Sequence, residues 1–156
     1  MAECKNIMVY VETAEGNPVK VGLEMLSPAK KLADKVTAVV IGGGVADAAK
    51  EVAKAGADQV ICVDSEDYKE FNLDAYAQVL VELVKEENPE AVFVGGTQDG
   101  KDIAPVVAAK CNTGCASDVL DIKAEDGEVI GRCKDQDNTT DSNITFRSIP
   151  ESGRPN

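Results

Sequence analysis

The stretch Asn6-Ile7-Met8-Val9-Tyr10-Val11-Glu12 (NIMVYVE) is an apolar run of the length of one strand, rich in β-branched residues. A run without polar alternation is typical of a strand that is buried on both faces. Three similar runs follow at residues 36–41 (VTAVVI), 59–63 (QVICV) and 91–94 (AVFV). These four segments predict one parallel sheet, because both faces of a parallel sheet are covered by helices.

Segments with helical spacing separate the four predicted strands. They occupy residues 20–34, 46–55, 74–87 and, after the last of these strands, about 101–110. In the first segment, Ser27-Pro28 is either an N-cap and first helical residue, so that the helix begins there, or a kink within a longer helix. Strands that alternate with helices in this way form βαβ units. The sequence therefore predicts an α/β fold with a doubly wound, mostly parallel sheet and helices on both faces.

The C-terminal part of the chain has a different pattern. Residues 119–123 and 128–132 flank Glu125-Asp126-Gly127, which predicts a small antiparallel hairpin. Residues 134–143 (KDQDNTTDSN) contain no hydrophobic residue, and such a segment has little apolar area with which to offset its ordering entropy. We expect one domain at residues 1–133 and a polar, mobile tail at residues 134–156, with residues 143–147 as a candidate edge strand.

The charge balance narrows the class of partner. Sixteen basic and 28 acidic residues give a formal net charge of −12. Such a chain repels nucleic-acid phosphates and anionic lipid, so we expect no nucleic-acid or membrane-surface binding. No apolar run approaches the roughly 20 residues that cross a bilayer. The N-terminus, Met1-Ala2-Glu3-Cys4-Lys5, lacks the pattern of a signal peptide, which favours the cytoplasm.

Residue chemistry gives no indication of an enzyme. The sequence contains no histidine, the side chain best suited to proton transfer near neutral pH. Its five cysteines are an odd number at irregular spacing, which argues against a disulfide framework. Cys111-Asn-Thr-Gly-Cys115 supplies only two thiols, too few for a tetrahedral metal site. We therefore expect neither a catalytic constellation nor a metal.

Two glycine-rich loops follow predicted strands, at the end of the sheet where ligands of open α/β folds bind. Gly42-Gly43-Gly44 lacks the spacing of a dinucleotide fingerprint, and a plain tight turn explains it better. The loop from Gly95 to Gly100 is the stronger candidate for contact with a nucleotide or a partner, through Gly95, Gly96, Thr97 and Gly100. An ordinary connection between a strand and a helix explains the same loop equally well.

The order of these segments resembles the N-terminal domain of electron transfer flavoprotein α subunits, over residues 6–122. The most specific stretch is Gly95-Gly96-Thr97-Gln98-Asp99-Gly100-Lys101-Asp102-Ile103-Ala104-Pro105, followed by Ala108-Ala109-Lys110 and Thr113-Gly114. Further matching stretches are IMVYVE at residues 7–12, VVIG at 39–42, AGADQV at 55–60 and NLDAYA at 72–77. The chain departs from the family's usual pattern after Ile130.

The resemblance implies a subunit of an electron carrier with a fold like that of adenine-nucleotide α-hydrolases and universal stress proteins. Members of the family are heterodimers of an α and a β subunit, and the FAD lies mainly on a separate C-terminal domain of the α subunit. We therefore expect a β subunit as partner and no FAD bound to this chain alone. Self-association is expected if the face that a partner covers is left exposed. The alternative is a stand-alone adenine-nucleotide-binding module of the universal-stress-protein type.

Overall fold

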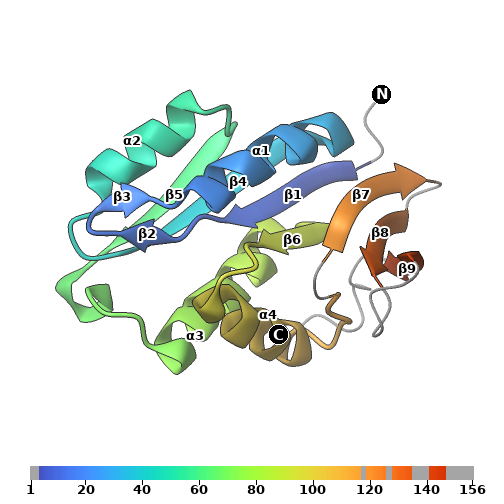
Figure 1. Cartoon of the computed structure of the whole chain (residues 1–156). Helices are drawn as coiled ribbons and strands as arrows, with labels where there is room; N and C mark the ends of the chain where they lie inside the picture. Colours follow the sequence, from blue (N-terminus) through green and yellow to red (C-terminus); the bar gives the residue numbers. More distant parts are fainter. Residues whose placement is uncertain (1–3, 117–118, 126–127, 135–140, 147–156) are drawn as a thin grey trace.

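Four parallel strands form the central sheet, in the order β5-β4-β1-β6 (Figure 1). Their bounds are Cys4–Tyr10 for β1, Ala33–Gly42 for β4, Gln59–Asp64 for β5 and Ala91–Val94 for β6. The computed structural model describes residues 4–116, 119–125, 128–134 and 141–146. All three pairings within this sheet are parallel, as the apolar runs predict.

Helices cover both faces of the sheet (Figure 1). One face carries α1 (Lys20–Leu32) and α2 (Ala46–Lys54), and the other carries α3 (Leu73–Glu87) and α4 (Gln98–Lys110). A short 3₁₀ helix, η1 (Glu66–Tyr68), precedes α3. This arrangement is the doubly wound α/β fold that the sequence predicts. None of the described helices has the length and hydropathy needed to cross a bilayer.

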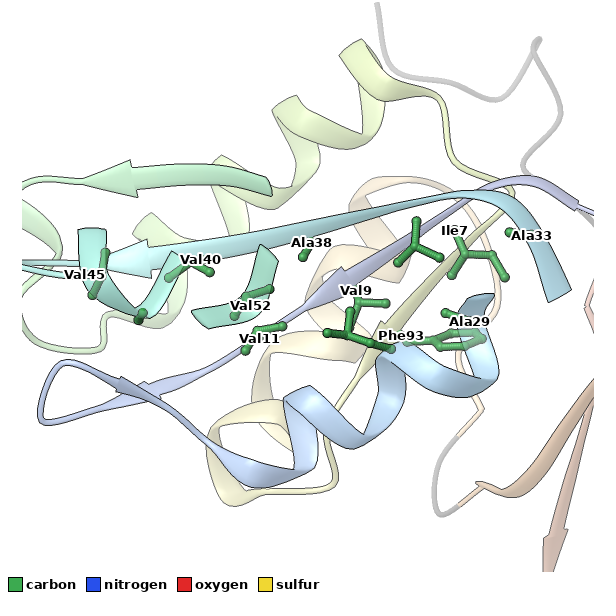
Figure 2. Packing of buried hydrophobic residues seen from close by; sticks show 13 residues of the cluster. Ile7, Val9, Val11, Ala29, Ala33, Ala38, Val40, Val45, Val52 and Phe93 are labelled. Atoms are coloured by element: carbon green, nitrogen blue, oxygen red, sulfur yellow. The ribbon is translucent and has the colours of Figure 1, made fainter. Parts of the chain in front are cut away.

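The central strand β1 divides the core into two clusters. Ile7, Val9 and the adjoining Val11 pack with residues of α1 and α2, as Figure 2 shows for part of this cluster. Met8 and Tyr10 point to the opposite face and pack with residues of α3 and α4. Because successive side chains of a strand point to opposite faces, an apolar run without alternation is what this position in the sheet requires.

Helix α1 is continuous through Pro28, so the longer of the two predicted helices is correct and a start at Ser27 is wrong. Leu26 and Ala29 are buried against the sheet, whereas Ser27 and Pro28 are exposed. The proline ring therefore lies on the solvent side, where it does not disturb the packing of the helix. The helix ends at Leu32, and β4 begins at the next residue, earlier than predicted.

Two antiparallel sheets complete the fold. Strands β2 (Thr13–Ala14) and β3 (Asn17–Pro18) form a hairpin in which Glu15 and Gly16 have φ of 52° and 80°. The other sheet has the order β7-β8-β9. Its strands are β7 (Val119–Glu125), β8 (Glu128–Lys134) and β9 (Asp141–Phe146), and β7 and β8 form the predicted hairpin.

The predicted boundary between a domain and a tail falls within this last sheet. Strand β9 occupies most of the candidate edge strand and pairs with β8. Most of the predicted mobile segment, residues 135–140 and 147–156, lies outside the described residues, as do residues 126–127 of the hairpin turn. The division at residue 133 therefore stays a prediction.

Candidate functional site

The four residues predicted to contact a nucleotide or a partner lie in the loop between β6 and α4 and in the first turn of α4. Thr97 is the N-cap of α4: its Oγ1 accepts a hydrogen bond from the backbone N–H of Gly100 at 3.0 Å. The same hydroxyl donates to the Glu12 carboxylate, with 2.5 Å between Thr97 Oγ1 and Glu12 Oε1. Both hydrogen-bond partners of this hydroxyl belong to the chain itself. Thr97 therefore fixes the start of α4 beside the end of β1, a structural role that accounts for its hydroxyl.

The three glycines among these residues differ in what surrounds them. A Cβ at Gly100 would lie 2.0 Å from the backbone oxygen of Gly95, and a Cβ at Gly95 would lie 2.8 Å from Cγ1 of Val21. Both positions thus need glycine for the close packing of α4 and α1 against the end of β6. A Cβ at Gly96 would meet no atom within 4 Å. Of these three glycines, Gly96 alone has open space beside it. Their role as cofactor ligands stays a prediction.

Glu12 lies at the carboxyl end of β1, where the chain leaves the sheet. Its backbone oxygen accepts a hydrogen bond from Val19, and its side chain is partly buried. Burial raises the pKa of this carboxyl group, the hydrogen bond from Thr97 opposes that increase, and the nearby Asp99 adds to it. Glu12 is therefore an acidic group that the fold holds in one place and makes costly to ionise.

A pocket of about 430 Å³ opens at the carboxyl ends of β1 and β4. This is the edge of the sheet at which ligands of open α/β folds bind. The lining residues come from the end of β1, the β2–β3 hairpin, the loop after β4, the segment around η1, and α3 and α4. They are Tyr10, Glu12, Thr13, Glu15, Gly16, residues 41–45, Lys69, Phe71, Tyr76 and Asp99.

The triple glycine forms one wall of this pocket. It is also a turn, as the sequence indicates: Gly44 has φ of 71°, and its N–H donates to Asp64 Oδ1 at 2.7 Å. None of the four predicted cofactor residues is among the residues that line the pocket, although Asp99 in the first turn of α4 is. The loop that the sequence ranks second therefore contributes more of the pocket surface than the loop that it ranks first.

Sequence reasoning missed the residues that give the pocket its character. Tyr10 reads as one more apolar residue of a buried strand, and Glu12 as the first polar residue after it. One signal was present: Glu12 lies two residues beyond the end of β1, and Gly42 ends β4, so that the two must meet at the same edge of a parallel sheet. The aromatic residue Phe71 lies outside every stretch that the sequence analysis singles out, and Tyr76 lies in the matching stretch at residues 72–77, which gave no sign of a pocket.

The cysteines give no sign of a metal centre in the part of the chain that the structure describes. Cys111 is buried and Cys115 is exposed, and neither is in a disulfide. Burial raises the pKa of both thiols, which disfavours the thiolate that binds metal. Within the described ranges, no three Cys, Asp or Glu side chains are grouped so that they would hold a metal ion.

A parallel sheet wound on both faces, with a pocket at the carboxyl ends of its strands, defines a doubly wound α/β domain. Comparison with known proteins places it more closely: residues 7–142 match the electron transfer flavoprotein domain. The chain therefore belongs to the electron transfer flavoprotein family, and it corresponds to the N-terminal domain of the α subunit.

Individual relatives agree with this placement. The chain is 37% identical over 136 residues to the protein FixB of Clostridium saccharobutylicum, covering 83% of this chain and 40% of the relative. It is 40% identical over 122 residues to the electron transfer flavoprotein subunit alpha of Syntrophomonas wolfei, covering 78% of this chain and 38% of the relative. It is 33% identical over 146 residues to the acryloyl-CoA reductase electron transfer subunit beta of Anaerotignum propionicum, covering 91% of this chain and 40% of the relative. The chain thus spans about 40% of the length of these curated relatives.

Proposed function

We propose that this chain supports the assembly of an electron transfer flavoprotein α subunit with its β subunit, in flavin-based electron transfer. The match to the electron transfer flavoprotein domain over residues 7–142 carries this proposal. Relatives named as subunits of electron-transferring assemblies, including the lactate dehydrogenase (NAD(+),ferredoxin) subunit LctC of Acetobacterium woodii, support it. We place this assembly in the cytoplasm.

The chemistry of the chain supports a role as carrier subunit rather than as an enzyme. The sequence contains no histidine. The Glu12 carboxylate of the pocket accepts a hydrogen bond from the Thr97 hydroxyl, but that hydroxyl also caps α4 and so has a structural role. The chain therefore contributes shape and surface to the assembly, and the redox chemistry belongs to the flavin.

The pocket does not fit FAD. The pyrophosphate of FAD is anionic, and among the described residues the lining has the carboxylates of Glu12, Glu15 and Asp99 against a single cation, Lys69. Carboxylates that face a phosphate repel it and leave its oxygens without donors. The same charge pattern weighs against a stand-alone adenine-nucleotide-binding module. We therefore propose that this chain alone holds no FAD.

A sizing column tests the assembly directly. The purified chain is mixed in equimolar amounts with an electron transfer flavoprotein β subunit, and each is also run alone. The proposal expects the two to elute together, since a stable interface buries more than roughly 1,000 Å². The run of the chain alone reports any self-association. Separate elution of the two proteins at micromolar concentrations would contradict the proposal.

An absorption spectrum and a nucleotide titration test the remaining parts. The purified chain is expected to have no flavin absorption after incubation with FAD and desalting. Calorimetry with AMP and ATP is expected to give no binding heat at millimolar nucleotide. A stoichiometric yellow protein would overturn the proposal on FAD, and saturable heat with AMP would favour the stand-alone nucleotide-binding module.

A further inference from the structure

Tyr10 forms an enclosed wall of the pocket at the ends of β1 and β4. Only 2% of this residue is exposed. Its hydroxyl makes no hydrogen bond within the part of the chain that the structure describes, whereas the neighbouring Tyr76 hydroxyl donates to the backbone oxygen of Tyr68. Among these residues, no fully enclosed side-chain oxygen or nitrogen lacks a partner. The Tyr10 hydroxyl therefore lies at the surface of the pocket, where a bound group can form a hydrogen bond with it.

The charges around Tyr10 are mostly negative. Glu12 and Asp99 both raise the pKa of the Tyr10 hydroxyl, after the larger effect of burial, so both carboxylates lie within electrostatic reach of it. Glu15 adds a third carboxylate to the lining. The opposing cation, Lys69, is exposed, and a long flexible side chain of this kind turns readily toward solvent. A pocket lined in this way attracts a positively charged group and repels an anion.

Aromatic rings complete the lining. Phe71 and Tyr76 both line the pocket, and their rings meet edge to face with centroids 5.0 Å apart and an interplanar angle of 77°. Tyr68 holds Tyr76 from another side, with ring centroids 5.8 Å apart. The faces of such rings attract cations, and a guanidinium group in particular stacks on them. This rigid aromatic cluster provides the apolar surface that an organic cation needs.

A metal ion is a poorer occupant than an organic cation. Hard cations such as Mg²⁺ and Ca²⁺ require about six or more oxygen ligands that converge on one point. The carboxylates of the pocket do not converge in this way: within the described residues, no three acidic or cysteine side chains form such a group. One of the two oxygens of Glu12 is also taken by the hydrogen bond from Thr97.

We propose that this pocket binds a small organic cation that carries a guanidinium group. The guanidinium is planar and has five N–H donors, so it pairs with the carboxylates of Glu12 and Asp99 and with the Tyr10 hydroxyl oxygen while it lies against the aromatic rings. The volume of about 430 Å³ is within the range of small-molecule sites, roughly 300–1,000 Å³. The site depends only on the geometry of this pocket, and it is independent of assembly with a β subunit.

Agmatine, a four-carbon chain with one guanidinium and one ammonium group, is a suitable probe. It is titrated into the chain in a calorimeter, and saturable binding in the micromolar to millimolar range is expected. Asp99→Asn removes one carboxylate and Tyr10→Phe removes only the hydroxyl, and each is expected to weaken binding by about tenfold, the effect of losing one hydrogen bond to a charged group. Lys69→Met removes the opposing charge and is expected to strengthen binding.

Glu24→Gln is the matched control, because it removes one negative charge on α1 outside the pocket. It is expected to bind agmatine as the unchanged chain does. Circular dichroism of each variant checks the fold. If Asp99→Asn does not fold, Tyr10→Phe still tests the proposal, because it keeps the packed ring. Absence of saturable heat with agmatine at millimolar concentration would overturn the proposal. So would equal weakening by Glu24→Gln and Asp99→Asn, because binding would then depend on net charge alone.

Discussion

Gly100→Ala provides a sharp test of the packing at the start of α4. The added Cβ would lie 2.0 Å from the backbone oxygen of Gly95 and 3.0 Å from Oε1 of Glu12. Neither neighbour yields easily, since one is backbone and the other is held by the hydrogen bond from Thr97. The helix must therefore move away from the end of β6 to admit one methyl group.

The expected magnitude follows from two opposing effects. Overpacking costs typically 1–3 kcal/mol, and a clash with backbone at this distance belongs at the upper end, about 3 kcal/mol. Alanine gains about 1 kcal/mol over glycine as a helical residue. The net loss is about 2 kcal/mol, which lowers the ratio of folded to unfolded chain by roughly thirtyfold. For a chain of this size, Tm falls by roughly 4–8 °C.

Urea unfolding followed by circular dichroism measures this loss, because the sequence has no tryptophan to report by fluorescence. Gly96→Ala, in the loop just before α4, is the matched control: its Cβ would meet nothing within 4 Å, so we expect a change of less than about 0.5 kcal/mol. The reasoning is refuted if Gly100→Ala unfolds at the same urea concentration as the unchanged chain, or if both variants lose the same stability.

Substitutions at three further positions can be measured by the same urea unfolding. Thr97→Ala removes the N-cap of α4 and should lower the free energy of unfolding by about 1 kcal/mol. Thr97→Ser keeps the hydroxyl and should lower it by less than about half as much. Equal losses of stability in the two variants would contradict the capping role. Hydrogen bonds from Lys30 and from the backbone N–H of Val36 lower the pKa of Asp58. The ionised Asp58 therefore stabilises the folded chain above its unfolded pKa of about 4, and this contribution is lost as the pH falls through the folded pKa. Asp58→Asn should therefore be less stable by about 0.5–1 kcal/mol at pH 7, allowing for the exposure of this pair, and equal to the unchanged chain in acid; a constant difference across pH would contradict this. The pKa of Glu12 is raised, chiefly by burial, so the folded state loses stability as the pH rises from about 4 through the folded pKa of this group. The Glu12→Gln variant should therefore be as stable as the unchanged chain in acid and more stable at pH 7. Lower stability of the variant at pH 7 would contradict this.

The sheet could be predicted from the sequence because its pattern is simple. A strand buried on both faces needs an uninterrupted apolar run, and residues 91–94 coincide with β6 in full. The predicted ends of the helices and strands are less accurate where a side-chain hydrogen bond decides where the element begins. Helix α4 begins at Gln98, three residues before the expected start, because Thr97 caps it; the polar residues Gln98 and Asp99 gave the appearance of a loop.

The pocket could be predicted only in part, because it depends on distances between elements far apart in the chain. The rule that ligands bind at the carboxyl ends of parallel strands led to the right edge of the sheet. It did not separate Gly95 and Gly100, which serve close packing, from Gly43 and Gly44, which line the pocket. A glycine that admits a ligand and one that admits a neighbouring backbone look the same in sequence.

The most direct test of the central claim is sedimentation velocity of this chain with an electron transfer flavoprotein β subunit. The β subunit is held at one concentration while the chain is added up to and beyond an equimolar amount. Our account predicts a single heavier species that saturates at one chain per β subunit. Two boundaries that sediment as the separate proteins at every ratio would contradict it.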